Sequence, residues 1–196
     1  MLAAGQSRRM GKTKQLLPWG ETTVLGQTIE NLQQSTVDSI LVVSGHEAEA
    51  VTAVAAECGV AVVHNPRYAT GEMLSSLQAA LPHLPADCHG VLVALADQPM
   101  VPAAVVDRLL AVFHGGERQH DTDQIVAPIY EGRRGNPVLI GRAFFDELLA
   151  LPAGAAPRAL LQRHPEKVRL VPVESDTILR DLDRPEQYEQ ERPSTP

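Results

Sequence analysis

Short apolar segments alternate with helical patterns through residues 22–113, and this alternation limits the possible folds more than any other sequence feature. The apolar segments are SILVVSG (39–45), VAVVHNP (60–66) and GVLVALADQP (90–99). Around them lie stretches that are alanine-rich or place apolar residues at helical spacing: 22–34, 47–59, 71–84 and 101–113. Because the strands are apolar throughout, both of their faces should be covered. The pattern predicts an α/β protein with a doubly wound, mostly parallel sheet and helices on both faces.

The second half of the chain is less regular. Residues 125–132 and 168–173 predict strands, and residues 132–151 predict a turn, a short strand and a helix. Elsewhere we expect a polar loop at 114–123, a short helix at 157–165 and a last helix with Pro185 in its first turn. The length favours one domain, which we place at residues 1–190, with a disordered tail at 191–196.

The first strand is unusually short. Only Met1 to Ala4 precede a glycine-containing loop, whereas a central strand usually needs about five residues to cross a sheet. Either this strand is short in the native protein or the native chain begins upstream of Met1; we favour the second.

The loop GQSRRMGKT (5–13) resembles a phosphate-binding P-loop but differs from it in two ways. Five residues separate Gly5 from Gly11, one more than in the pattern G-x-x-x-x-G-K-[ST]. Pro18 and Gly20 also follow too soon for the helix that should face the phosphates. The segment nevertheless combines two glycines with four cations: Arg8, Arg9, Lys12 and Lys14. We interpret it as an anion site; the alternative is a solvated run of charge.

The rest of the composition excludes several classes of partner. The formal net charge of −7 argues against nucleic acid and membrane surfaces, which favour an excess of Lys and Arg. Two cysteines provide neither a disulfide framework nor a zinc cluster and suit a reducing compartment. The sequence shows neither a membrane-spanning apolar run nor a signal peptide, so we expect a cytoplasmic protein.

Ligands of open α/β sheets bind at the carboxyl ends of the strands, so the residues that follow the strands are candidates for a site. After the strand at 60–66, Gly71 precedes a helix in which Ser75 and Ser76 offer hydroxyl groups. In the segment 90–99, Asp97 directly follows the apolar run of the strand. A carboxylate is costly at that position unless it holds a cation. Helix capping is the alternative role for Asp97, although the next helix begins only after Pro102.

A second carboxylate is needed, because Mg²⁺ usually takes one or two carboxylates together with water and phosphate oxygens. Asp181 and Asp183 are two residues apart and would point to opposite sides of an extended chain, so we expect only one to face the metal. Helix capping by Asp183 ahead of Pro185 is an equally good interpretation of that residue.

Taken in order, LAAGQSRRMGKTKQLLPWG, NPRYATGEMLSSL, ADQP, RGNPVL and DLDRPEQY resemble the MobA-like nucleotidyltransferases, and among them the molybdenum cofactor cytidylyltransferases. The resemblance spans nearly the whole chain. It implies a Rossmann-like, nucleotide-diphospho-sugar transferase-like fold that transfers CMP from CTP to the terminal phosphate of molybdopterin, with Mg²⁺ and release of pyrophosphate.

The same resemblance implies roles for individual residues. Arg9, Lys14 and Asp97 would be catalytic, and Asp97 and Asp183 would hold the metal. Ala3 and Ala4 favour cytosine over guanine. The nucleotide-binding set would be Leu2, Ala3, Ala4, Gly5, Arg9, Lys14, Gly71, Ser75, Ser76 and Asp97. The acceptor would lie against Gly135, Asn136 and Pro137.

The chain departs from relatives where the acceptor is expected. It has LPAGAAPRALL where relatives carry an acidic residue, and Arg184 where they usually carry Thr. Two alternatives therefore stay open: transfer to another small phosphate such as a sugar phosphate, or a noncatalytic carrier that delivers the cofactor to a molybdoenzyme. Retention of Arg9, Lys14, Asp97 and Asp183 favours catalysis, because a carrier needs no clamp for pyrophosphate.

Overall fold

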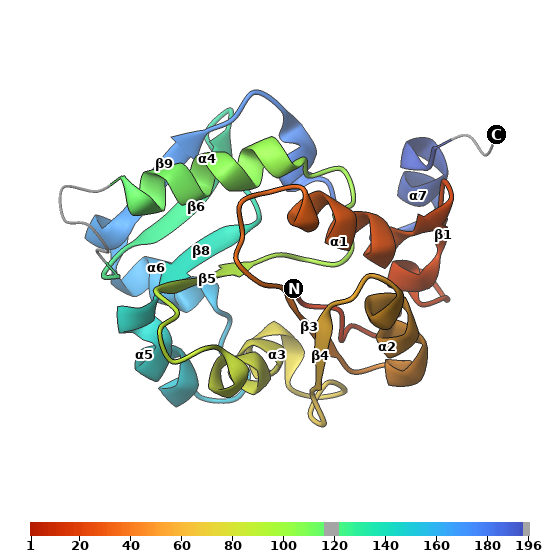
Figure 1. Cartoon of the computed structure of the whole chain (residues 1–196), viewed down its shortest axis with the longest axis horizontal. Helices are drawn as coiled ribbons and strands as arrows, with labels where there is room; N and C mark the ends of the chain where they lie inside the picture. The colour runs from red at the N-terminus through yellow and green to blue at the C-terminus, as the bar shows by residue number, and fades with distance from the viewer. Residues whose placement is uncertain (116–121, 194–196) are drawn as a thin grey trace.

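The computed structural model describes residues 1–115 and 122–193 (Figure 1). Most of the polar loop predicted at 114–123 and the last three residues of the predicted tail lie outside this description. Within the described residues, every helix is too short or too polar to cross a membrane.

The centre of the fold is a twisted sheet whose two parts are joined by one residue. One part pairs β3 (Leu41–Ser44) with β4 (Ala61–His64) in parallel. The other runs in the order β5 (Gly90–Val93), β8 (Val138–Gly141), β6 (Ile125–Tyr130), with β9 (Val168–Pro172) on the outer side of β6. Leu2 bridges Val43 and Leu95, both in parallel, and so continues the sheet from β3 to the extension of β5. Of these strands only β8 runs antiparallel to its neighbours, which confirms the mostly parallel sheet.

Helices cover both faces of the sheet, as predicted (Figure 1). One face carries α1 (Val24–Gln33), α2 (Ala48–Glu57) and α4 (Ala103–His114), and the other carries α3 (Glu72–Ala80), α5 (Phe145–Ala150) and α6 (Arg158–Arg163). Successive strand residues serve opposite faces, because side chains alternate along a strand. Thus Ile125 packs with the cluster of α3, α5 and α6, whereas Val126 packs against Leu109 and Phe113 of α4.

The remaining elements are short and complete the edges. A hairpin of β1 (Pro18–Trp19) and β2 (Thr22–Thr23) precedes α1, and β7 (Arg133–Arg134) folds back on β6. The 3₁₀ turns are η1 (Lys14–Leu16), η2 (Leu81–His83), η3 (Arg142–Phe144), η4 (Pro165–Lys167) and η5 (Asp176–Leu179). The chain ends in α7 (Pro185–Glu191).

The C-terminal segment returns to the beginning of the chain. Tyr188 of α7 is buried with Trp19 and Leu182, and its hydroxyl donates to the Pro18 carbonyl oxygen at 2.6 Å. This small apolar cluster is separate from the cores on the two faces of the sheet. It fixes residues 181–183 beside the N-terminal loop, and therefore beside the predicted site.

Candidate active site

A cavity of about 440 Å³ opens at the carboxyl ends of the central strands. Three segments line it: residues 2–8 with Lys14 and Gln15; residues 68–70, 72, 73 and 76 from the loop before α3 and its first turns; and residues 95–97 after β5. Of the predicted site residues, the lining contains Leu2, Ala3, Ala4, Gly5, Lys14, Ser76 and Asp97. The loops that parallel strands present at one edge thus enclose one cavity, as the position of the motifs predicts.

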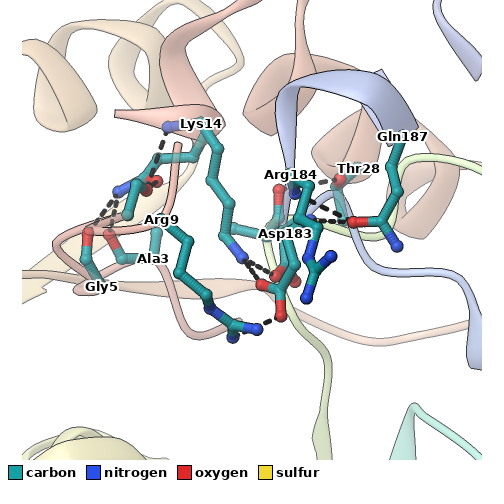
Figure 2. Close-up of polar contacts among 12 residues, drawn as sticks. Ala3, Gly5, Arg9, Lys14, Thr28, Asp183, Arg184 and Gln187 are labelled. Atoms are coloured by element: carbon teal, nitrogen blue, oxygen red, sulfur yellow. Dashed lines mark hydrogen bonds and ion pairs between the residues drawn. The ribbon is translucent and has the colours of Figure 1, made fainter. Parts of the chain in front are cut away.

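The cationic loop contacts an acidic group (Figure 2). The Lys14 ammonium forms ion pairs with Asp97 and, at 2.7 Å, with Asp183. The Arg9 guanidinium pairs with the other oxygen of Asp183 at 2.5 Å. The Lys14 and Asp97 side chains are each 15% exposed, whereas Arg9 is 67% exposed. Lys14 is therefore a fixed member of the site, and Arg9 lies at its open edge.

Three carboxylates converge at this point, one more than predicted. Oxygen atoms of Asp97, Asp181 and Asp183 all lie within 4.8 Å of one another. The expectation that Asp181 and Asp183 would point to opposite sides is wrong, because the segment is not extended; whether both hold a metal stays a prediction. The Asp183 amide donates back to the Asp181 carbonyl oxygen at 3.0 Å, and this tight turn brings both side chains to the same side. Such a group of oxygens suits a hard divalent cation.

Leu182, between the two aspartates, explains why they lie beside Asp97. Its side chain is fully buried, and its amide donates to the Asp97 carbonyl oxygen at 3.1 Å. Asp183 does not cap α7, because the N-cap position is Arg184; the Gln187 side-chain oxygen accepts from the backbone amides of Asp183 and Arg184 at 3.0 and 2.9 Å. The Asp183 carboxylate is therefore left for Lys14, Arg9 and a ligand.

The charges in the group shift its pKa values in different directions. Burial, followed by the negative charges of Asp183 and Asp97, raises the pKa of Asp181. Burial acts the same way on Asp183, but Lys14 and Arg9 outweigh it and lower the pKa of that carboxyl group. Burial opposes the charge on Lys14, yet Asp97 and Asp183 outweigh it and raise the pKa of the ammonium. The two cations thus keep Asp183 ionised, whereas Asp181 is more readily protonated than Asp183.

The wall formed by the loop before α3 and its first turns contains fewer of the predicted residues than expected. Ser76 lines the cavity, but Gly71 and Ser75 lie behind the lining. The Ser75 hydroxyl donates to the Glu72 carbonyl oxygen at 3.0 Å and accepts from Asn65 at 2.8 Å. At Gly71 a β-carbon would lie 2.3 Å from the Ser75 β-carbon, so glycine is required there by packing. A nucleotide-binding role for Gly71 and Ser75 stays a prediction, and neither residue lines the cavity.

Asn65 is the central residue of this wall, and the sequence analysis missed it. It is fully buried, donates to both Ser75 and Ser76 (2.8 and 3.0 Å), and accepts from the Arg67 amide at 2.9 Å. Its only sequence signal is a polar side chain directly after an apolar strand and before Pro66. Tyr68 and Met73 also line the cavity without having been predicted.

The predicted acceptor residues lie at the turn into β8 and contact η5. The Asn136 amide donates to the Ile178 carbonyl oxygen at 3.0 Å, and a β-carbon on Gly135 would lie 2.3 Å from the same oxygen. Pro137 packs near Leu95 and Gln98, beside the strand that ends at Asp97. Their acceptor-binding role stays a prediction, and their visible role is to dock the second half of the sheet against η5.

Comparison with known proteins decides the family. The model of the MobA-like NTP transferase domain matches residues 1–168. The chain belongs to this family. Its membership confirms the nucleotidyltransferase class predicted from the sequence.

The relatives of this MobA-like protein include proteins named for different activities. It is 28% identical to the molybdenum cofactor cytidylyltransferase of Escherichia coli (strain K12), over 95% of this chain and 90% of that one. It is also 29% identical to the nicotine blue oxidoreductase of Paenarthrobacter nicotinovorans, over 95% and 92%. The crystal structure of Rv0371c from Mycobacterium tuberculosis H37Rv superposes with a TM-score of 0.80 at 32% identity, covering 96% and 94% of the two chains. A complex of Rv0371c with manganese matches with a TM-score of 0.78 at 30% identity, covering 96% and 94%.

Proposed function

We propose that this protein transfers CMP from CTP to the terminal phosphate of molybdopterin and releases pyrophosphate. The observation that carries the proposal is the contact of Lys14 with both Asp97 and Asp183, because it joins the cationic loop to the acidic group at the cavity. A noncatalytic carrier would need neither part. The similarity to a molybdenum cofactor cytidylyltransferase over 95% of the chain supports the same conclusion.

The nucleotide would enter the cavity with its base toward Ala3 and Ala4 and its triphosphate toward Lys14. A volume of about 440 Å³ falls within the usual range for a small-molecule site. Gly5 leaves open space where a β-carbon would stand, so a phosphate can approach the loop backbone closely. The pair Ala3–Ala4 favours cytosine, as the family resemblance implies.

The acidic group fits a divalent metal, which we take to be Mg²⁺. Asp97, Asp181 and Asp183 supply only oxygen donors, and three carboxylates outnumber the two cations that pair with them. When bound, the metal would polarise the α-phosphate and neutralise charge on the leaving group.

The cations of the loop would act on the triphosphate. The acceptor phosphate oxygen forms a bond to the α-phosphorus, the bond from that phosphorus to the β-phosphate bridge breaks, and pyrophosphate leaves with the electron pair. Lys14 uses two of its three N–H donors on Asp97 and Asp183, so one is left for a phosphate oxygen. Arg9 is exposed enough to reach the β- and γ-phosphates and to stabilise charge that develops there.

The acceptor side would involve Gly135, Asn136 and Pro137, and a molybdoenzyme is the partner that would receive the product. The family resemblance supports this half of the proposal. The segment LPAGAAPRALL, which lacks the acidic residue usual in relatives, is where this chain departs from them.

The test is release of pyrophosphate from each of the four NTPs with Mg²⁺, with and without molybdopterin. We expect release from CTP that depends on molybdopterin. Release that requires a sugar phosphate instead would replace the acceptor and keep the reaction class. A protein that binds molybdopterin but releases no pyrophosphate from any NTP would be a carrier.

A further inference from the structure

Gln15 is a buried polar residue directly after Lys14, and the proposed reaction gives it no role. It is 3% exposed and lies in η1 at the end of the cationic loop. A buried primary amide is costly unless its donors and acceptor are satisfied. Its partners therefore indicate what the side chain is for.

All three hydrogen bonds of Gln15 return to the beginning of the loop. Its amide nitrogen donates to the carbonyl oxygens of Ala3 and Gly5 at 3.0 and 3.2 Å, and its oxygen accepts from the Ser7 hydroxyl at 3.2 Å. The dashed lines that reach Ala3 and Gly5 in Figure 2 mark the first two bonds. Because carbonyl oxygens only accept, the orientation of the amide is fixed by its surroundings.

Ser7 supplies a second connection between the two ends. Its hydroxyl oxygen accepts from the Lys14 amide at 3.0 Å while its proton goes to Gln15. Ser7 also has a positive φ of 49°, the conformation that turns the chain toward Lys14. The Lys14 backbone is therefore connected to the beginning of the loop twice: through its own amide to Ser7, and through the side chain of the next residue, Gln15.

The other end of this connection is the centre of the sheet. The Ala3 amide donates to the Val43 carbonyl oxygen of β3 at 2.9 Å. Between the two ends, Arg8, Arg9, Gly11 and Lys12 are exposed, so this part of the loop has little packing of its own. Gln15 thus links Lys14, through Ala3, to strand β3 of the sheet.

From these contacts we infer that Gln15, assisted by Ser7, is a positioning residue that holds Lys14 at the distance from Asp97 and Asp183 needed to bind a triphosphate. The inference deepens the proposed function and rests on it only for the identity of the anion. Gln15 itself touches neither Asp97 nor Asp183 and acts through Lys14.

The experiment measures binding of inorganic tripolyphosphate with Mg²⁺ by calorimetry, which needs no turnover. Gln15→Met keeps the size of the side chain and removes all three hydrogen bonds. We expect it to weaken tripolyphosphate binding about tenfold, and Lys14→Met to weaken it at least as much. Gln33→Met is the matched control, because that exposed amide also donates to a backbone carbonyl, of Cys58 at 2.8 Å, but on another part of the surface; it should leave binding unchanged.

The double variant Gln15→Met/Lys14→Met decides how Gln15 acts. If it acts through Lys14, the double variant binds no more than about twofold more weakly than Lys14→Met alone. Multiplication of the two single effects would overturn the inference, and so would binding by folded Gln15→Met equal to that of the original protein. Should Gln15→Met fail to fold, Ser7→Ala removes the connection to the Lys14 amide and leaves Gln15, and it should weaken binding about threefold.

The outcomes separate this inference from the proposed function. Binding of tripolyphosphate that depends on Lys14 and Gln15, with no pyrophosphate released from any NTP, would remove the reaction and keep the positioning role. Unchanged tripolyphosphate binding by Lys14→Met would remove the positioning role, whatever the reaction is.

Discussion

Each of two walls of the cavity is held in place by one buried side-chain amide, but the walls differ in which side chains they leave for a ligand. The cationic wall, residues 5–14, is held by the buried amide of Gln15, and the serine wall, residues 65–76, is held by the buried amide of Asn65. Both amides are almost completely buried, and each makes three hydrogen bonds across a loop that follows a strand.

The walls differ in what remains for a ligand. In the cationic wall the bracing residue is separate from the functional ones, and Arg9 stays 67% exposed. In the serine wall the hydroxyls are themselves part of the brace, since Ser75 donates to Glu72 and accepts from Asn65. A polar side chain near a strand end is therefore a better ligand candidate when another residue makes the hydrogen bonds that hold the loop, as Gln15 does for the cationic wall.

The largest effect is expected at the acidic group that faces the cationic wall. Asp97→Asn removes one charge that contacts Lys14 and one of the three carboxylates proposed to hold the metal, so turnover should fall by about 10³-fold. Steady-state release of pyrophosphate measures this. Far-ultraviolet circular dichroism and the midpoint of urea unfolding should stay close to those of the original protein. Turnover near the original rate would remove Asp97 from the site.

The next effect should appear in stability and should be confined to the serine wall. Asn65→Ala leaves the Arg67 amide and two serine hydroxyls without their partner, which should lower the free energy of unfolding by about 2–4 kcal/mol. Urea unfolding measures the change. Tripolyphosphate binding should change less than about twofold, because the anion contacts the other wall. A tenfold loss would show that the two walls are coupled.

A smaller effect should separate the two serines. Ser76→Ala removes a hydroxyl that lines the cavity, so the KM for CTP should rise about threefold to tenfold with kcat little changed. Ser75→Ala should leave the KM for CTP unchanged and lower the free energy of unfolding by about 1 kcal/mol. Equal changes in KM for both variants would contradict the difference between a hydroxyl that lines the cavity and one that lies behind the lining.

The smallest effect lies outside both walls. The His164 hydrogen bond, followed by that of Arg163, lowers the pKa of Glu147 on α5. The contribution to stability is therefore present above pH 4.5 and is lost as the pH falls through the lower pKa of the folded state. Glu147→Gln should cost at most about 1 kcal/mol at pH 7, because the pair is partly exposed, and less at pH 3. Urea unfolding at both pH values measures it; a larger cost at pH 3 would reverse the sign.

Much of the fold follows from local sequence patterns. The strands at 41–44, 61–64 and 90–93 lie inside the predicted apolar runs, and the helices between them lie inside the predicted helical stretches. The direction of β8 and the position of β9 beside β6 could not be predicted. Strand order depends on which apolar faces meet in three dimensions, and short apolar segments do not specify their partners.

Some residues of the site could likewise be predicted from local sequence, and others could not. Lys14, Asp97 and Asp183 were predicted, and they meet. We expected only one of Asp181 and Asp183 on the side of Asp97, on the assumption of an extended chain; the turn at Asp183 brings both there. Asn65 and Gln15 were missed because a bracing amide has no spacing rule; its partners come from other segments.

The sequence by itself determined the alternating α/β architecture, the cationic glycine loop and the carboxylates at strand ends, because each of these depends on neighbouring residues or on the ends of local elements. Only the tertiary structure decided that Asp97 shares one acidic group with Asp181 and Asp183, 84 and 86 positions later in the chain. It also decided that Ser76 lines the cavity whereas Ser75 lies behind the lining. The physical reason is burial: Leu182 is drawn into the apolar cluster of Trp19 and Tyr188, and the aspartates on either side of it are brought to Asp97.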